Sequence, residues 1–250
     1  MTLDLTFFLM AVPAVIFAGI SKGGFGSGAA FAAAPFLALI LEPQQAVGLM
    51  LPLLMLVDAV TLRPFWRRWD WAASRLLILG GLPGVALGAL FWRAANPDVV
   101  RFLIGAIALG FVVFQLARAR GWLRIETLAP GPAAGLTAGV AAGFTSFVSH
   151  AGGPPAAVYL LSKGMSKTAY QASTVLIFWA INLAKAVPYA AMGFFTTETL
   201  TAGLWLAPAA LAGAWIGVKA HRMIPERPFF AVTYVLLTIT GAKLVFDALA

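Results

Sequence analysis

The chain has 250 residues, of which 61% are hydrophobic and 10% are charged, and its formal net charge is +8. A soluble domain of this size needs more charge on its surface, so the composition excludes that class and indicates a helical membrane protein. The chain has no cysteine, and His150 and His221 are too few and too far apart for a zinc site. Disulfides and thiolate or histidine metal centres are therefore excluded.

The first half of the chain, residues 1–124, is expected to form a hairpin of short helices followed by three membrane spans. The first ten residues lack the basic region and cleavage site of a signal peptide and are expected to begin the first helix. The hairpin turns at a glycine-rich elbow, G-I-S-K-G-G-F-G-S-G, from Gly19 to Gly28. The expected elements are helices at 5–20 and 28–41, which make the hairpin 5–41, and spans at 45–62, 75–92 and 98–117.

The second half, residues 125–250, is expected to repeat this order. Its elbow is G-F-T-S-F-V-S-H-A-G-G-P-P, from Gly143 to Pro155, where two prolines and a glycine pair break the helix. The expected elements are helices at 131–147 and 154–162, which make the hairpin 131–162, and spans at 168–190, 200–219 and 228–248.

The two halves match at an offset of 124 residues, which aligns Gly19 with Gly143 and Asp58 with Asn182. Each half holds one hairpin and three spans, an odd number of crossings, so the second copy is expected to be inverted in the membrane. The predicted fold class is an all-α polytopic membrane protein of two inverted-topology repeats, each a broken-helix hairpin plus three transmembrane helices. Many secondary transporters share this plan.

Basic residues gather in four loops that together hold twelve of the seventeen lysines and arginines. These loops are 63–75, 118–124, 163–167 and 219–227. Such a pattern indicates membrane topology rather than nucleic-acid binding, and the positive-inside rule assigns these loops to the cytoplasm. The breaks at 42–45 and 191–199 contain Glu42 and Glu198 but no basic residue. They are assigned to the outside, together with both chain termini.

The two elbows are predicted to form one substrate site near the membrane midplane, because irregular backbone at that depth must be buried in protein or line a wet cavity. A helix follows each elbow, and the unpaired N–H groups at its start attract anions. Two such helix starts facing each other predict an anion cradle, whereas close helix packing is the alternative explanation for the small residues. The candidate substrate-binding residues are Ser21, Lys22, Gly23, Gly24, Gly26, Ser27, Gly28, Thr145, Ser146, Ser149, His150, Gly152 and Gly153.

Ionisable residues inside the spans are candidates for ion coupling, because burying them in a membrane is costly. Asp58 is expected either to carry a coupling proton or to pair with Arg63, and its repeat mate Asn182 has the same shape without the charge. Lys185 is expected either to offset substrate charge or to snorkel to the outer membrane surface.

The histidines have different expected roles. His150, in the second elbow, can donate to an oxyanion or relay a proton, and the alternative is a packed, hydrogen-bonded side chain. His221 lies in a basic loop and is expected to be solvated.

The motifs around the two elbows keep a specific order and spacing. In the first half, G-I-S-K-G-G-F-G-S-G is followed by A-A-P-F-L and Q-A-V-G; in the second, S-H-A-G-G-P-P-A-A-V-Y-L-L is followed by A-Y-Q-A-S-T. Over nearly its full length the chain resembles the TauE/SafE family of sulfite and organosulfonate exporters. The resemblance implies a transporter of the bacterial inner membrane that exports a small sulfur-containing anion and is driven by an ion gradient.

Secondary active export of a small anion is therefore the expected function, with a passive anion channel of the same architecture as the alternative. An enzyme is not expected, since H-E-x-x-H, paired span aspartates and G-x-S-x-G are absent, and the absence of G-x-x-x-x-G-K-[ST] argues against ATP-driven transport. The expected partners are the anion, a coupling proton and the lipid bilayer. No cofactor, metal or nucleic acid is expected, and a homodimer is left open.

Overall fold

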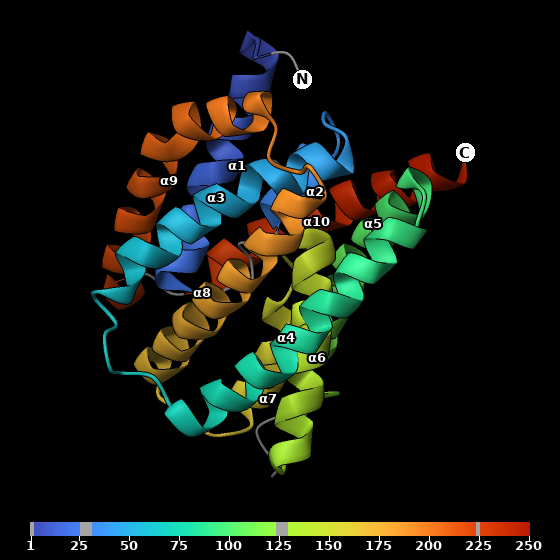
Figure 1. The fold of residues 1–250 in the computed structure, drawn as a ribbon. Helices are drawn as coiled ribbons and strands as arrows, with labels where there is room; N and C mark the ends of the chain where they lie inside the picture. The colour runs from blue at the N-terminus through green and yellow to red at the C-terminus, as the bar shows by residue number, and fades with distance from the viewer. Residues whose placement is uncertain (1–2, 26–31, 124–129, 224–225) are drawn as a thin grey trace.

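The structure, a computed structural model, describes residues 3–25, 32–123, 130–223 and 226–250, and the regular elements of this part are all α-helices (Figure 1). The predicted all-α class is confirmed. The helices are α1 (Leu5–Gly24), α2 (Ala33–Leu37), α3 (Pro43–Leu62), α4 (Trp71–Ala94), α5 (Pro97–Ala119), α6 (Pro132–Ser149), α7 (Gly153–Leu161), α8 (Lys167–Ala191), α9 (Thr197–Met223) and α10 (Glu226–Leu249).

In the described part, six helices are long and apolar enough to cross a membrane, namely α1, α3, α4, α5, α8 and α9. The six predicted spans overlap α3, α4, α5, α8, α9 and α10. The agreement comes from apolar run length and from local signals at helix starts. Asp70 and Asn96 each accept a hydrogen bond from the backbone N–H three residues on, at 2.8 Å, and prolines occupy the first turn of α3, α5 and α6.

The first hairpin differs from its prediction. α1 continues unbroken to Gly24, so its 20 residues, at about 1.5 Å each, extend about 30 Å, enough to cross a hydrocarbon core. The expected helix at 28–41 is reduced, among the described residues, to the five residues of α2 and a following turn.

Helix contacts explain why α1 does not break at its glycines. A Cβ added at Gly19 would lie 2.8 Å from the carbonyl oxygen of Ala210, and one at Gly23 would lie 2.6 Å from that of Ala214. Both partners belong to α9, so these glycines let two backbones touch, a common device in membrane helix pairs. Glycine in a helix costs only about 1 kcal/mol relative to alanine, which such packing offsets.

The second hairpin breaks where the sequence predicts, over a shorter stretch. α6 runs through Gly143 to Ser149, His150 adopts a left-handed conformation with φ 58° and ψ 13°, and α7 begins at Gly153. The N–H of His150 donates to the carbonyl of Ser146 at 2.9 Å, which closes the helix end. The break is therefore confined to three residues between two helices.

The helices pack in pairs that correspond across the two halves. α1 packs along α9 and α6 packs along α4, while α5 packs on α10 and α3 contacts α8 (Figure 1). The α4–α6 contact also uses glycine, since a Cβ at Gly139 would lie 2.6 Å from the carbonyl oxygen of Leu77. This pairing is the kind expected from a repeat, and the division into two inverted copies stays a prediction.

The segments assigned to the outside lie together at one end of the molecule. Gln44 donates to the carbonyl of Gly193 at 3.4 Å, and Arg101, at the start of α5, pairs with Glu42 at 2.8 Å. The start of α1 and the end of α10 lie toward this same upper end of Figure 1.

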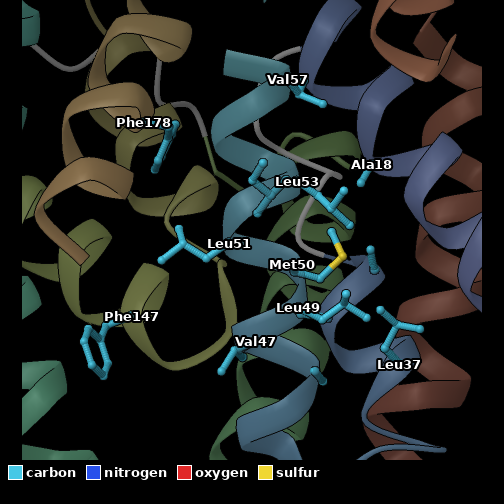
Figure 2. Close-up of a cluster of buried hydrophobic side chains, with 14 of the residues drawn as sticks. Ala18, Leu37, Val47, Leu49, Met50, Leu51, Leu53, Val57, Phe147 and Phe178 are labelled. Atoms are coloured by element: carbon cyan, nitrogen blue, oxygen red, sulfur yellow. The ribbon is translucent and has the colours of Figure 1, made fainter. Parts of the chain in front are cut away.

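The apolar core is built around α3, which is surrounded by other helices. Figure 2 shows Val47 and Leu51 on the side of Phe147 in α6, and Met50 on the opposite side, near Leu37 of α2. All five side chains are at most 1% exposed. α3 therefore connects the two halves, and its polar residue Asp58 lies inside protein rather than lipid.

Candidate functional site

Lys22, Asp58 and Asn182 form a buried polar chain across three helices. Lys22 of α1 makes an ion pair with one carboxylate oxygen of Asp58 in α3, and the side-chain amide of Asn182 in α8 donates to the other at 2.8 Å. All three residues are at most 3% exposed. Both carboxylate oxygens of Asp58 therefore interact with buried side chains, one with Lys22 and the other with Asn182. The alternative prediction, an ion pair between Asp58 and Arg63, is wrong.

Lys185, one turn further along α8, is fully buried, so the expectation that it snorkels to the membrane surface is wrong. Its ammonium group lies 2.9 Å from the carbonyl oxygen and 3.0 Å from the hydroxyl oxygen of Ser146, and 2.8 Å from Nδ1 of His150. Nε2 of His150 lies 3.0 Å from the carbonyl oxygen of Val47. These partners fit a neutral His150 that accepts from Lys185 and donates to Val47.

The segments beside the two elbows are joined through α3 and α8. Gln171 of α8 donates to the carbonyl of Lys22 at 2.7 Å, and His150 contacts Val47 of α3. Ala32, after the first elbow, and Ala151, in the second, belong to one apolar cluster with residues of α5 and α10. We name Lys22, Asp58, Ser146, His150, Asn182 and Lys185 the central cluster.

The central cluster contains more basic than acidic side chains. Among the described residues it holds two lysines and one carboxylate, and none of the hydrogen-bond partners of Lys185 is a carboxylate. An isolated charge inside a protein is costly unless it is paired. The cluster is therefore suited to receive an anion.

The remaining predicted residues contribute in different ways. Ser21 and Ser149 are fully buried. The hydroxyls of Thr145 and Ser149 donate hydrogen bonds to backbone carbonyls of α6 and of the turn that follows it. A Cβ at Gly152 would lie 2.6 Å from both the carbonyl oxygen of Ala142 and a ring carbon of Phe178. Gly23 and Gly24 pack on α9, whereas Gly26, Ser27 and Gly28 lie outside the described residues.

The start of α7 offers fewer amide donors than the predicted cradle needs. Pro154 and Pro155 occupy its first turn and have no N–H, and the N–H of Ala156 donates to the carbonyl of Gly152 at 3.3 Å. Gly153 is buried at the helix start. An anion at this elbow would therefore depend mainly on side-chain cations.

A model of the family described as "Sulfite exporter TauE/SafE" matches residues 11–244. The chain belongs to the TauE/SafE family. Its members are membrane transporters and not enzymes, and the suspected relationship is confirmed. No curated protein and no solved structure matches the chain. With its apolar helices, this TauE/SafE protein is a multi-pass membrane transporter.

On the side of the central cluster that faces the end of α8, aromatic side chains of this TauE/SafE protein pack together. The ring of Tyr189 lies 4.9 Å from that of Phe147 and 4.5 Å from that of Phe194, and Trp92 lies 5.1 Å from Phe194. Tyr189, Phe147 and Phe194 are at most 2% exposed. The rings of Tyr189 and Phe147 thus pack against Phe194 of the segment 191–199, and Lys185 lies 5.9 Å from the ring of Tyr189.

On the opposite side, a cavity of about 680 Å³ reaches Gly24 at the end of α1. Its lining includes Gln171 and His221, both buried, and Nδ1 of His221 lies 2.7 Å from the carbonyl oxygen of Gly24. The expectation that His221 is solvated is therefore wrong. The sequence did not predict these contacts of His221 and Gln171, because each residue contacts α1, which is distant in sequence. The one signal in the sequence was the A-Y-Q-A-S-T motif, which contains Gln171.

Proposed function

We propose that this TauE/SafE protein is a secondary active transporter that exports a small sulfur-containing anion, sulfite or an organosulfonate, from the bacterial cytoplasm. The observation that carries the proposal is Lys185, fully buried and hydrogen-bonded to Ser146 and His150 without a described carboxylate partner. Substrate would supply the missing negative charge. The family assignment supports sulfite as the first anion to test.

Lys22 and Lys185 are proposed to hold the anion from two sides, with the hydroxyl of Ser146 and the ring of His150 orienting its oxygens. A tetrahedral or pyramidal oxyanion presents several acceptor oxygens, which suits converging ammonium and hydroxyl donors. Because Asp58 already pairs with Lys22, substrate and the Asp58 carboxylate compete for the same ammonium group.

That competition supports proton coupling. When Asp58 takes up a proton, Lys22 loses its counter-charge and becomes available to the anion, so the binding of proton and anion are linked. Asn182 cannot titrate, and its amide keeps the Asp58 side chain in place by the 2.8 Å hydrogen bond. In the first half of the proposed repeat this position can therefore bind a proton, whereas the equivalent position in the second half stays uncharged.

A transporter is favoured over a passive channel because the two sides of the central cluster differ. The cavity approaches it from the side of Gly24, whereas Tyr189, Phe147 and Phe194 pack on the other side. A channel needs a continuous pore, while a transporter keeps one side closed at a time.

Flux of sulfite into proteoliposomes tests the proposal. Purified protein is reconstituted, and sulfite accumulation is followed with and without an imposed pH gradient, with Lys185→Gln as the inactive control. Accumulation above the external concentration that needs the pH gradient supports coupled transport. Downhill flux that ignores the gradient identifies a channel, and the absence of flux for sulfite and for a panel of sulfonates overturns the proposed substrate class.

A further inference from the structure

The cavity beside Gly24 has the size and position of an entrance chamber. Its volume of about 680 Å³ lies within the range of about 300–1,000 Å³ usual for small-molecule sites. Its walls come from the ends of α5, α7, α8 and α9 and from Tyr234 of α10. We call this cavity the vestibule; none of its residues belongs to the central cluster.

The floor of the vestibule is connected to the central cluster by hydrogen bonds. Gln171, 1% exposed, lines the vestibule and donates to the carbonyl of Lys22 at 2.7 Å. His221 binds the carbonyl of Gly24, two residues further on, at 2.7 Å. A molecule that reaches the floor is therefore next to the peptide groups that carry the Lys22 side chain.

The described side chains that line the vestibule include an arginine and a lysine. Arg118 and Lys167 line its walls, and no residue of the lining in the described part is acidic. Clefts lined by one sign of charge raise the local concentration of oppositely charged ligands.

The vestibule opens on the basic end of the molecule. Arg118 is the first residue of the basic loop 118–124 and Lys167 is the last of the basic loop 163–167, and the positive-inside rule assigns both loops to the cytoplasm. A cytoplasmic opening is the one from which an exporter collects its substrate.

We propose that the vestibule is a second anion site, at which Arg118 and Lys167 capture a small oxyanion from the cytoplasm before it passes Gln171 to the central cluster. The identity of the oxyanion rests on the proposed function, whereas the preference of the vestibule for anions does not. Gln171 and His221 are positioning residues at its floor.

Thiol reactivity measures the charge preference directly, since the natural chain has no cysteine. Ala157, a partly buried residue of α7 in the vestibule wall, is replaced in the variant Ala157→Cys. Inside-out vesicles are treated with an anionic methanethiosulfonate carrying a sulfonate group and with a cationic one of similar size. We expect the ratio of the anionic to the cationic rate, normalised to the same ratio for a free thiol, to exceed one.

Removing charge from the wall then identifies its source. In the Ala157→Cys background, Arg118→Gln with Lys167→Gln should lower the ratio by at least about tenfold, the low end of electrostatic focusing in clefts. Lys163→Gln is the matched control, because Lys163 is in the same basic loop but donates to the carbonyl of Pro130 at 2.8 Å and does not line the vestibule. It should leave the ratio unchanged.

Transport kinetics give a second readout. If sulfite is carried, Arg118→Gln and Lys167→Gln should raise KM severalfold from the vestibule side with kcat nearly unchanged, unlike Lys163→Gln. A ratio of one or less, or the same ratio in the neutralised and control variants, overturns the vestibule even if sulfite is transported. A high ratio that depends on Arg118 and Lys167 in a protein that does not carry sulfite supports the vestibule and overturns only the substrate.

Discussion

The side-chain amide of Asn182 donates to the carboxylate of Asp58 at 2.8 Å, although the two residues are 124 positions apart in the chain. That separation equals the offset between the two halves of the sequence, so equivalent positions of the predicted repeat touch each other. Residues related by a two-fold axis can meet only near that axis. The contact of α3 with α8 is therefore where a two-fold relation between the halves would have its axis.

Replacing Asp58 with asparagine should flatten the pH dependence of sulfite transport, because the group that competes with substrate for Lys22 can no longer titrate. Initial rates in proteoliposomes between about pH 5 and 8, the usual range of maximal protein stability, would measure this. A profile that stays parallel to that of the wild type removes Asp58 from coupling.

The same substitution should destabilise the protein, because Lys22 would remain buried without a counter-charge. Breaking a buried ion pair by removing one partner costs about 3–5 kcal/mol, which lowers Tm by roughly 6–20 °C for a chain of this size. The double variant Lys22→Gln with Asp58→Asn should recover most of the loss and still fail to transport. If the double variant is no more stable than Asp58→Asn, the ion pair is not what holds α1 to α3.

Replacing Lys185 with glutamine should weaken sulfite binding by at least about tenfold, since a hydrogen bond to a charged group contributes about 1.5–3 kcal/mol. Lys243→Gln is the control, because Lys243 is half-exposed and pairs with Asp247 at 2.7 Å on α10. Isothermal titration in detergent measures both affinities. Equal affinity in the two variants would mean that Lys185 does not contact the anion.

A methyl group at Gly152 should destabilise the second elbow rather than only block substrate, because the new Cβ would lie 2.6 Å from the carbonyl oxygen of Ala142. Overpacking of this kind costs about 1–3 kcal/mol, so Gly152→Ala should lower Tm by several degrees. Gly110→Ala is the matched control in α5, where nothing lies within 4 Å of the added Cβ. Equal melting temperatures for Gly152→Ala and Gly110→Ala would show that the second elbow accommodates the added methyl group without loss of stability.

Single cysteines introduced at the two ends of the molecule should be accessible to an impermeant thiol reagent from opposite sides of the membrane. Gln44→Cys and Thr197→Cys, both at exposed positions near the 42–45 and 191–199 breaks, should react with an impermeant thiol reagent on intact cells. Arg68→Cys, in a basic loop, should react only after the cells are opened. Labelling of Arg68→Cys on intact cells would reverse the assignment of the two sides.

The sequence by itself determined the class of the protein, the positions of most of its long helices and its family, but it predicted only a short helix where α1 is long enough to cross a membrane. Apolar run length and local capping act over a few residues, so α3, α4, α5, α8 and α9 overlap their predicted ranges. The proline pair after Gly153 predicts the second break for the same reason. Asp58 and Lys185 are candidates from sequence because ionisable groups are rare inside spans, Asn182 because it is the repeat mate of Asp58, and Lys22 because it lies in the first elbow.

Only the tertiary structure decided what these residues contact. Lys22 meets Asp58 across 36 positions and Lys185 meets Ser146 across 39, distances over which no local rule operates. The same is true of the glycines of α1, whose contacts with α9 keep a helix intact where the local sequence suggests a break. Local propensities amount to about 1 kcal/mol per residue, and contacts between distant helices are large enough to override them.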